Sequence, residues 1–310
     1  MQEDPKTQSI RSHQKSRPEK EVWTLQQALE KVGGFGAYQK TTVVLLAILH
    51  SFSAYQVYTF GYLTRAPPFL CREGDSDWQE CKKEEICAPG FSQEWKFDTS
   101  DKYYLKNFFT EMDMTCWKQS DINWMVQLQF VGFFFGTPLF LILEKFGRIK
   151  ALNLIIPILL LGTWLVMQTD SYNFMCIGFF LQGIGHIKKP LSYGFPIENC
   201  DKNSSSMGIS IILFFDMLVM FFFQFGAIFI TNDAIAIIRW ACLTQSFVIL
   251  LLPFFMLESP TWLIQNRRND EARTVLNKIA EFNGKDKSNY VPKHVKLVLK
   301  PLDEKQEGAV

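Results

Sequence analysis

The sequence has little histidine and lacks the patterns that mark an enzyme's active site. Its histidines are scattered, and none lies near a nucleophile or a second metal ligand in the sequence. They are His13, His50, His186 and His294. The sequence also lacks a glycine-rich loop followed by Lys and Ser or Thr, which argues against an ATP-driven pump. We therefore expect no catalytic residues, no metal and no cofactor.

Excess charge of either sign is missing too. The 32 Lys and Arg residues nearly balance the 31 Asp and Glu residues, for a net charge of +1, so nothing favours a nucleic-acid partner. The N-terminal segment is polar and lacks the apolar stretch and cleavage site of a secretory signal peptide. The overall composition, 48% hydrophobic, would suit a soluble protein, so the informative property is how the residues are distributed.

Six stretches of the chain contain almost no charge. Each is close to the roughly 20 residues that a helix needs to cross the hydrocarbon core of a bilayer. Their ranges are 41–62, 122–143, 151–167, 174–197, 207–230 and 234–257. A large soluble helical core is the alternative, but six such stretches in one chain are rare there. The sequence therefore predicts an all-α, multi-pass integral membrane protein with a bundle of six transmembrane helices at 41–257.

Lysine and arginine are concentrated on one side of the predicted spans. They are frequent before the first span and in the short link after the second, which holds Lys145, Arg148 and Lys150. Because such residues are retained in the cytoplasm, we expect both termini to be cytoplasmic and the loop at 63–121 to be external. We expect the membrane to be the plasma membrane.

The predicted external loop holds four cysteines, Cys71, Cys81, Cys87 and Cys116. In an oxidising compartment, four cysteines favour two disulfides, with three possible pairings. The alternative is four free thiols. No histidine lies near these cysteines, so their spacing fits no zinc motif.

The segments on either side of the bundle are expected to lie in the cytoplasm. Apolar residues recur at three- and four-residue spacing within 22–40, which predicts an amphipathic helix on the inner membrane face. Ser259 before Pro260 starts one helix and Asn269 starts another, so 258–284 is predicted to form cytoplasmic helices. The polar segments 1–21 and 285–310 are predicted to be disordered tails, and no strand is predicted.

Short motifs in a fixed order resemble those of a known family. They are 29–36 before the first span, Pro68 and Cys71 in the loop, 110–116 before the second span, 145–148, Leu181-Gln182-Gly183, Glu198, Arg239-Trp240, 258–264 and Glu271-Ala272. Together they are similar to the organic cation, anion and zwitterion transporter branch of the major facilitator superfamily. The resemblance implies gradient-driven transport of small organic ions, by rocking of two six-helix halves within membrane lipids.

The resemblance covers one half of the family's twelve-span pattern. It implies a family member truncated to its N-terminal half, itself built from two three-helix repeats. The alternatives are a truncated isoform that does not transport and binds a full-length partner, and a chain cut short by an incomplete gene prediction. A homodimer could also supply the second half. We expect no concentrative transport by the chain alone, because one half would leave Lys188, Asp216 and Gln129 open to lipid.

Ionisable groups inside the predicted spans are the first candidates for a substrate cavity, because charge is costly in a bilayer. Lys188 lies in the fourth span, near the family's lysine position, and Asp216 lies in the fifth. We expect these two to pair across the cavity, with Lys189 pointing elsewhere. The alternative is a packed structural charge and a helix-packing contact. The candidates are completed by polar residues of a kind that commonly holds helices together, namely His50, Gln129 and Gln182.

A charged turn links the second and third predicted spans. The family's loop at this place latches the two halves, so the resemblance implies a gating role for Glu144, Lys145, Gly147, Arg148, Glu198 and Glu258. The chain departs from the family's pattern at several positions. Phe140 replaces a Gly and Glu144 an Asp, Phe179 and Thr261 each replace an Arg, and 204–206 replace a basic pair, so charge-pairing positions are partly lost.

Overall fold

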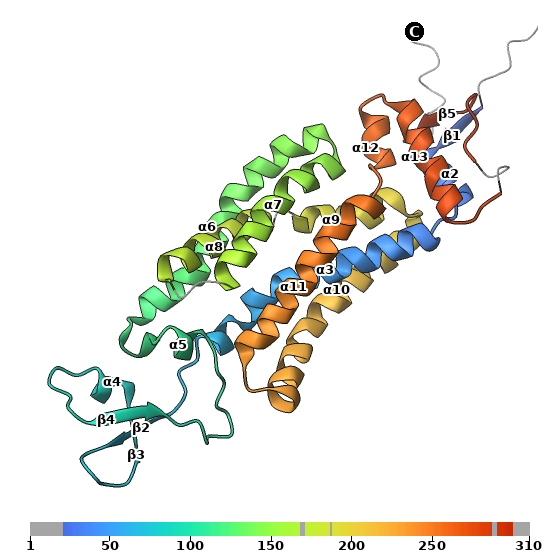
Figure 1. Cartoon of the computed structure of the whole chain (residues 1–310). Helices are drawn as coiled ribbons and strands as arrows, with labels where there is room; N and C mark the ends of the chain where they lie inside the picture. Colours follow the sequence, from blue (N-terminus) through green and yellow to red (C-terminus); the bar gives the residue numbers. More distant parts are fainter. Residues whose placement is uncertain (1–20, 168–170, 187, 287–289, 300–310) are drawn as a thin grey trace, which may run out of the picture.

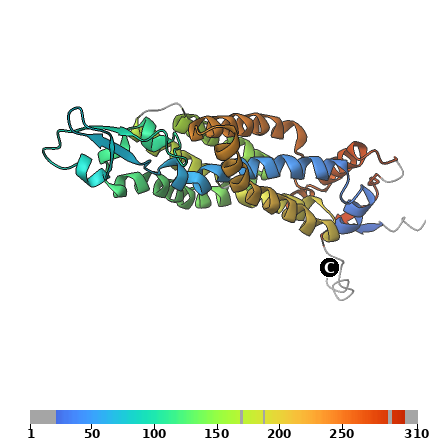
Figure 2. The same cartoon turned by 90° about the horizontal axis from the view of Figure 1, so that it is seen from below.

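The computed structural model describes residues 21–167, 171–186, 188–286 and 290–299. The molecule is elongated, with long helices between two small structured ends (Figure 1, Figure 2). One end, here called the disulfide end, carries a small sheet within residues 64–118. The other, here called the cap end, combines segments from both ends of the described chain, 21–36 and 260–299.

Seven helices of the described residues form the bundle. They are α3 (Ala37–Leu63), α6 (Gln119–Leu143), α7 (Arg148–Met167), α8 (Tyr172–Gly185), α9 (Lys188–Asn199), α10 (Lys202–Phe225) and α11 (Ala234–Phe255). Helix α8 packs on α6 and α7, while α3 packs on α10 and α11, so the bundle consists of two three-helix groups with α9 contacting α3 and α10 (Figure 1). A Cβ added at Gly132 of α6 or Gly183 of α8 would collide with the backbone of the opposite helix. The close α6–α8 packing therefore requires these glycines.

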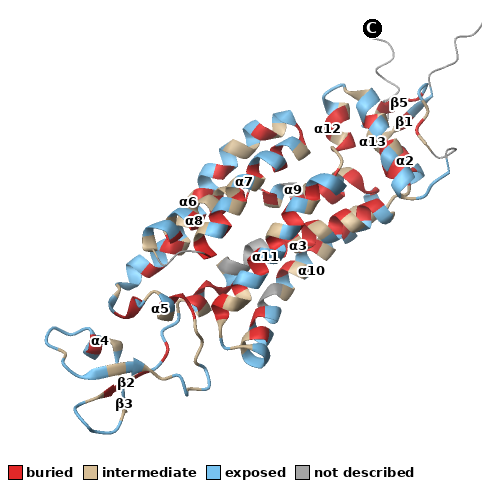
Figure 3. Ribbon diagram, in the orientation of Figure 1, coloured by how far each residue is buried: buried red, intermediate tan, exposed pale blue. Residues whose placement is uncertain are grey.

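Four helices of the described residues are long and apolar enough to cross a membrane. They are Gln119–Phe146, Arg148–Met167, Lys202–Ile230 and Ala234–Phe255, the third of which ends in a π-helix, η3 (Gly226–Ile230). The other two predicted windows, 41–62 and 174–197, fall on α3 and on the pair α8 and α9. Many large apolar side chains on the bundle are exposed, such as Phe134, Phe229 and Phe254 (Figure 3). Such a surface suits contact with hydrocarbon rather than water.

The disulfide end is an ordered unit rather than a plain loop. A three-stranded antiparallel sheet has the order β3-β2-β4, with β2 at Phe69–Arg72, β3 at Gln79–Cys81 and β4 at Glu94–Phe97. Short helices follow at α4 (Lys83–Ile86), α5 (Phe108–Glu111) and η1 (Met114–Cys116). Disulfides join Cys71 to Cys81 and Cys87 to Cys116, which confirms the two predicted bonds and selects one of the three pairings.

The cap end corrects two predictions made from the sequence. Segment 22–40 is not one helix but strand β1 (Val22–Thr24), helix α2 (Leu25–Lys31) and the start of α3, separated by a turn at Gly33 and Gly34, which both have positive φ. Strand β5 (Lys296–Val298) pairs in parallel with β1, and Leu297 is buried, so the prediction of disorder is wrong for 290–299. Most of the remaining predicted disorder, 1–20 and 300–310, lies outside the described residues.

Helices α12 (Pro260–Gln265) and α13 (Asn269–Phe282) complete the cap end and hold the start of α3. The N-cap of α3 is Gly36, which has no side chain to bond the first free N–H groups. Asn283, just after α13, replaces that cap: its Oδ1 accepts from the Tyr38 N–H (2.8 Å) and its Nδ2 donates to the Val32 carbonyl (2.9 Å). A Cβ at Gly36 would overlap the Asn283 amide, so this approach requires glycine.

Candidate functional site

Two hydrogen bonds and one longer histidine–aspartate contact join α3, α9 and α10 near the middle of these helices. We call this set of contacts the histidine network, formed by His50 and Tyr58 of α3, Tyr193 of α9 and Asp216 of α10. His50 Nε2 shares a hydrogen bond of 2.8 Å with the Tyr193 hydroxyl and lies 3.8 Å from Asp216 Oδ2. The Tyr58 hydroxyl donates to the same oxygen (3.1 Å). Asp216 Oδ1 is buried without a hydrogen-bond partner among the described residues.

Among the described residues, no ion pair joins Asp216 to either lysine at the start of α9. Lys189 is partly exposed, and of the two lysines it is the one whose charge acts on Asp216 at longer range. Lys188 is only 1% exposed, and its Nζ has no hydrogen-bond partner in the part of the chain that the structure describes. The predicted Lys188–Asp216 pair is therefore wrong. The prediction continued the phase of one helix through this region, whereas α9 begins at Lys188, after the end of α8.

The two candidate glutamines lie at the α6–α8 contact rather than with Asp216. Gln129 Nε2 is 2.7 Å from His186 Nε2, and both residues are buried. Gln182 is buried four residues before His186 on the same helical side. This contact is of the helix-joining kind that such polar residues commonly form.

Burial by the chain itself changes the expected surface. Lys188, Asp216 and Gln129 have exposed fractions of 1%, 4% and 2%. The expectation that one half leaves these groups open to lipid is therefore wrong, because neighbouring helices of the same half cover them. Tyr58 and Lys189, which reach the edge of the network, are the groups that remain accessible.

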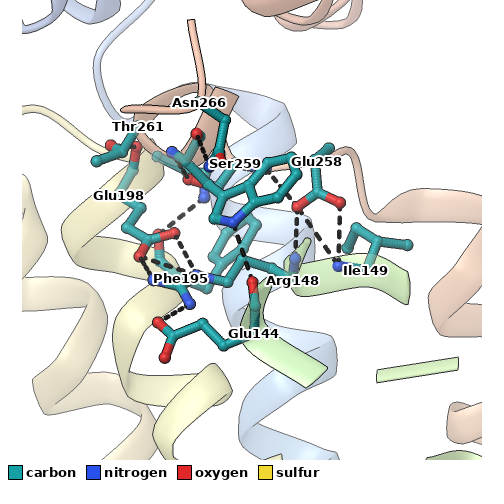
Figure 4. A network of polar contacts seen from close by, with 11 residues as sticks. Glu144, Arg148, Ile149, Phe195, Glu198, Glu258, Ser259, Thr261 and Asn266 are labelled. Atoms are coloured by element: carbon teal, nitrogen blue, oxygen red, sulfur yellow. Dashed lines mark hydrogen bonds and ion pairs between the residues drawn. The ribbon is translucent and has the colours of Figure 1, made fainter. Parts of the chain in front are cut away.

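A second cluster joins three separate links of the chain at the cap end. This arginine network consists of Glu144, Arg148, Glu198 and Glu258 (Figure 4). Arg148 forms an ion pair with Glu144 and donates to Glu198 Oε1 from Nη2 (2.7 Å) and Nε (3.2 Å). Glu258 accepts from the backbone N–H of Arg148 (2.7 Å), so its negative charge lies at the N-terminus of α7. Charge of this sign is favourable at that end of a helix.

Gly147 makes the approach of Glu258 possible. Its φ of 116° is a backbone conformation that glycine adopts readily and other residues rarely adopt. A Cβ at this position would also overlap the Glu258 carboxylate. Lys145, a member of the same predicted gating set, is exposed and forms no ion pair within the described residues. The structure thus brings five of the six predicted gating residues together and leaves Lys145 outside.

Residues that depart from the family's pattern form other contacts here. The Thr261 hydroxyl donates to the Glu198 carbonyl (3.2 Å), and the Trp262 indole N–H donates to the Glu144 carbonyl (3.0 Å). Phe179 is fully buried, with its ring edge-on to Phe60. An arginine at 179 would have to fit this apolar packing.

A cavity of about 240 Å³ lies beside the arginine network. We call it the cap-end cavity. Glu144, Arg148 and Glu198 line it together with apolar side chains from both three-helix groups and from α9. It lies where Leu46 of α3 faces Leu152 of α7.

Four polar residues that take part in or lie beside these contacts were not predicted as site residues from the sequence: Tyr58, Lys189, Tyr193 and His186. One local signal was available, since Lys189 and Tyr193 are four apart and share a helix face. Tyrosine gave no signal, because it is common in apolar helices and becomes informative only when its hydroxyl has a partner. The described residues contain no cluster of side chains suited to holding a metal ion.

Comparison with known proteins gives consistent results along the chain. Residues 43–298 match the family described as sugar (and other) transporter. The chain is 26% identical over 297 residues to organic cation transporter 1 of Caenorhabditis elegans, covering 83% of this chain and 49% of that protein. It is 25% identical over 319 residues to solute carrier family 22 member 1 of Bos taurus, covering 84% of this chain and 54% of that protein.

A shorter match extends to organic cation/carnitine transporter 2 of Homo sapiens. The identity is 26% over 209 residues, which cover 65% of this chain and 35% of that protein. The chain therefore spans about half the length of the curated relatives that it matches over most of its own length.

Proposed function

Because the chain belongs to the sugar (and other) transporter family, within the major facilitator superfamily, we propose that it supplies six spans to a gradient-driven transporter of small organic ions. Relatives of this family are transporters rather than enzymes. The relatives from Caenorhabditis elegans and Homo sapiens are named as transporters of organic cations and, for the latter, carnitine. We extend that substrate class, small organic ions, to this chain as part of the proposal.

In this proposal α3 is the first span, and α8 with α9 is the fourth. A helix of 27 residues is about 40 Å long, which exceeds the roughly 30 Å hydrocarbon core. The break between α8 and α9 is of a kind that transporters use near substrate sites, where interrupted helices free backbone groups. Both ends of the chain would be cytoplasmic and the disulfide end external, which suits an oxidising compartment. We place the protein in the plasma membrane.

The observation that carries the proposal is the histidine network. His50 lies halfway along α3, and Asp216 lies near the middle of α10. Ionisable groups at this depth are costly and are kept mainly where ions or substrates pass. Tyr58 and Lys189 connect the network to its accessible edge, so a substrate or a coupling ion arriving there would meet Asp216 through them.

The arginine network would hold the cap end closed in one state of the transport cycle. It ties the α6–α7 link, the end of α9 and the α11–α12 link, which belong to both three-helix groups. Alternating access needs such contacts to be reversible. The second six-helix half would come from a longer chain, a second copy or a full-length relative.

A second candidate function is a partner subunit that does not itself transport. It is favoured by the burial of His50, Lys188 and Asp216 within this half. Under this alternative the polar groups hold helices together, and uptake depends wholly on a full-length relative that copurifies with the chain.

Uptake measurements separate the two. Cells and reconstituted vesicles containing the chain are given labelled tetraethylammonium or benzenesulfonate under an imposed membrane potential. Transport predicts saturable uptake that Asp216→Asn reduces at least tenfold and that exposed Asp77→Asn leaves unchanged. Uptake equal to that of vesicles without protein, in both systems, would reject transport by this chain and favour the partner role.

Topology is tested on intact cells. An epitope inserted at Gly74, where a side chain would meet open space, should be labelled from outside, whereas tags at either terminus should be labelled only after permeabilisation. External labelling of a terminus would reverse the proposed orientation.

A further inference from the structure

The charged side chains that line the cap-end cavity carry more negative than positive charge. Two of its three charged side chains are glutamates, and the third, Arg148, already pairs with both. Asn199 also lines the cavity and is 1% exposed. Its Nδ2 donates to the Phe195 carbonyl (3.1 Å), but its Oδ1 has no partner among the described residues. A ligand here would therefore meet one net negative charge, whereas Asn199 Oδ1 lies behind the wall without accessible surface.

The rest of the wall is apolar and partly aromatic. Leu46, Leu152 and Met256 contribute aliphatic surface, and Phe140 and Phe195 contribute rings. Aromatic faces attract organic cations, whereas a hydrated metal ion would lose its water against such a wall. The volume of about 240 Å³ falls just below the roughly 300–1,000 Å³ of sites for drug-sized ligands. The occupant must therefore be small.

We propose that the cap-end cavity binds a small organic ammonium ion, at a site separate from the histidine network. The carboxylates of Glu144 and Glu198 provide the counter-charge, and the apolar and aromatic side chains of the wall hold its apolar groups. An anion would face two carboxylates whose only cationic neighbour in the cavity is already paired. Glu258 adds a further negative charge nearby, offset by the N-terminus of α7.

The site would be occupied from the cap end, next to the contacts that hold the two three-helix groups together. A cation bound between Glu144 and Glu198 competes with Arg148 for the same oxygens. Binding would thus loosen the arginine network, which is the contact that the proposed transport cycle must release. This consequence rests on the proposed function, whereas the binding itself does not.

Gly194 offers a direct way to fill the cavity. It lines the cavity on α9, and a Cβ added there would meet no atom within 4 Å. Gly194→Leu should therefore occupy ligand space while favouring helix. Gly61 on α3 also faces open space but does not line the cavity, so Gly61→Leu is the matched control.

The experiment measures equilibrium binding of labelled tetraethylammonium to the purified full chain in lipid nanodiscs, without transport. We expect saturable binding that Gly194→Leu weakens at least tenfold, that the isosteric Glu144→Gln weakens about tenfold, and that Gly61→Leu and the exposed Asp77→Asn leave in place. Benzenesulfonate should not compete. Size-exclusion elution and thermal stability verify that each variant is folded.

Absence of saturable binding, or binding that Asp216→Asn removes and Gly194→Leu and Glu144→Gln spare, would overturn the cavity site. Binding with the expected variant pattern but no uptake in any system would reject the proposed transport and leave the site intact. Uptake without cavity binding would reject the cavity site and leave the proposed transport intact.

Discussion

The two ends of the molecule are held together by different means. At the disulfide end, two covalent bonds close loops between residues 10 and 29 positions apart, around a sheet built from neighbouring segments. At the cap end no disulfide is found among the described residues, and a buried apolar cluster together with polar contacts joins distant parts of the chain. Glu258 forms a hydrogen bond to the start of α7, 110 positions earlier in the chain, and Asn283 forms one to the start of α3, 245 positions earlier.

The covalent bonds at the disulfide end are permanent, whereas the polar contacts near the cap end can break and re-form. Covalent loops keep the disulfide end in one conformation whatever the helices do. The arginine network beside the cap end depends on hydrogen bonds and ion pairs, each worth about 0.5–3 kcal/mol, which a change in helix position can exchange. Of the two, the cap end is therefore where a conformational cycle can open the molecule.

The largest expected effect is at the disulfide end. Cys87→Ser with Cys116→Ser removes the longer loop, and the chain-entropy model gives a loss of roughly 3–4 kcal/mol for a loop of this length. We expect a clear drop in the melting temperature of the purified protein and in the folded yield. Mass mapping of the unreduced protein should recover none of the four loop cysteines alkylated. An unchanged melting temperature would show that the sheet holds this end without its covalent bonds.

A smaller loss is expected in the arginine network. Arg148→Ala leaves Glu198, which is 14% exposed, without its cation, and should cost roughly 2–3 kcal/mol, below the value for a fully buried pair. The control is Arg268→Ala, which breaks an exposed pair with Glu271 and should not change thermal stability measurably. Equal losses in both variants would mean that the cap end gains nothing specific from Arg148.

In the bundle between the two ends, replacing Lys188 is expected to increase the stability of the protein. Its buried ammonium lacks a partner among the described residues, so Lys188→Met should raise stability by about 1–2 kcal/mol. Lys189→Met is the comparison: Lys189 is partly exposed, so removing its charge should change stability less. Thermal unfolding of both variants decides this. A loss of stability in Lys188→Met would contradict the prediction and would show that the ammonium has a stabilising partner in the folded chain.

The smallest effect is expected at the junction of α13 and α3. Asn283→Ala removes the amide that replaces the side-chain cap of α3 and should cost about 1 kcal/mol. Asn283→Asp keeps the acceptor for the Tyr38 N–H but loses the donor to Val32, so it should recover part of the loss. Hydrogen exchange of the first turn of α3 provides the measurement. Unchanged protection in Asn283→Ala would show that this cap is dispensable.

Sequence reasoning performed best where a long, uniform pattern determines the structure. Windows 122–143, 151–167, 207–230 and 234–257 each fall on a helix long enough to span, because about 20 uncharged residues leave few alternatives. The disulfides could be expected in number but not in pairing, since pairing depends on the sheet that brings Cys71 beside Cys81.

The remainder depends on contacts between distant segments. Strands of three or four residues carry no readable alternation, so β1 and β5 become visible only when they pair. The choice between Lys188 and Lys189 turned on where α9 begins. The arginine network was predicted through resemblance, yet its geometry depends on Glu258 reaching the N-terminus of α7 past Gly147, which no local pattern encodes.

The parallel pairing of β1 with β5 also sets an order of events during synthesis. Residues 22–24 leave the ribosome before any bundle helix, whereas residues 296–298 leave it after all of them. The strand pair therefore closes last, and only when the helices between have brought its two halves to the same place. Until then Leu297, buried in the finished fold, stays available to chaperones and proteases. A bundle that is only partly inserted therefore leaves both strands unpaired.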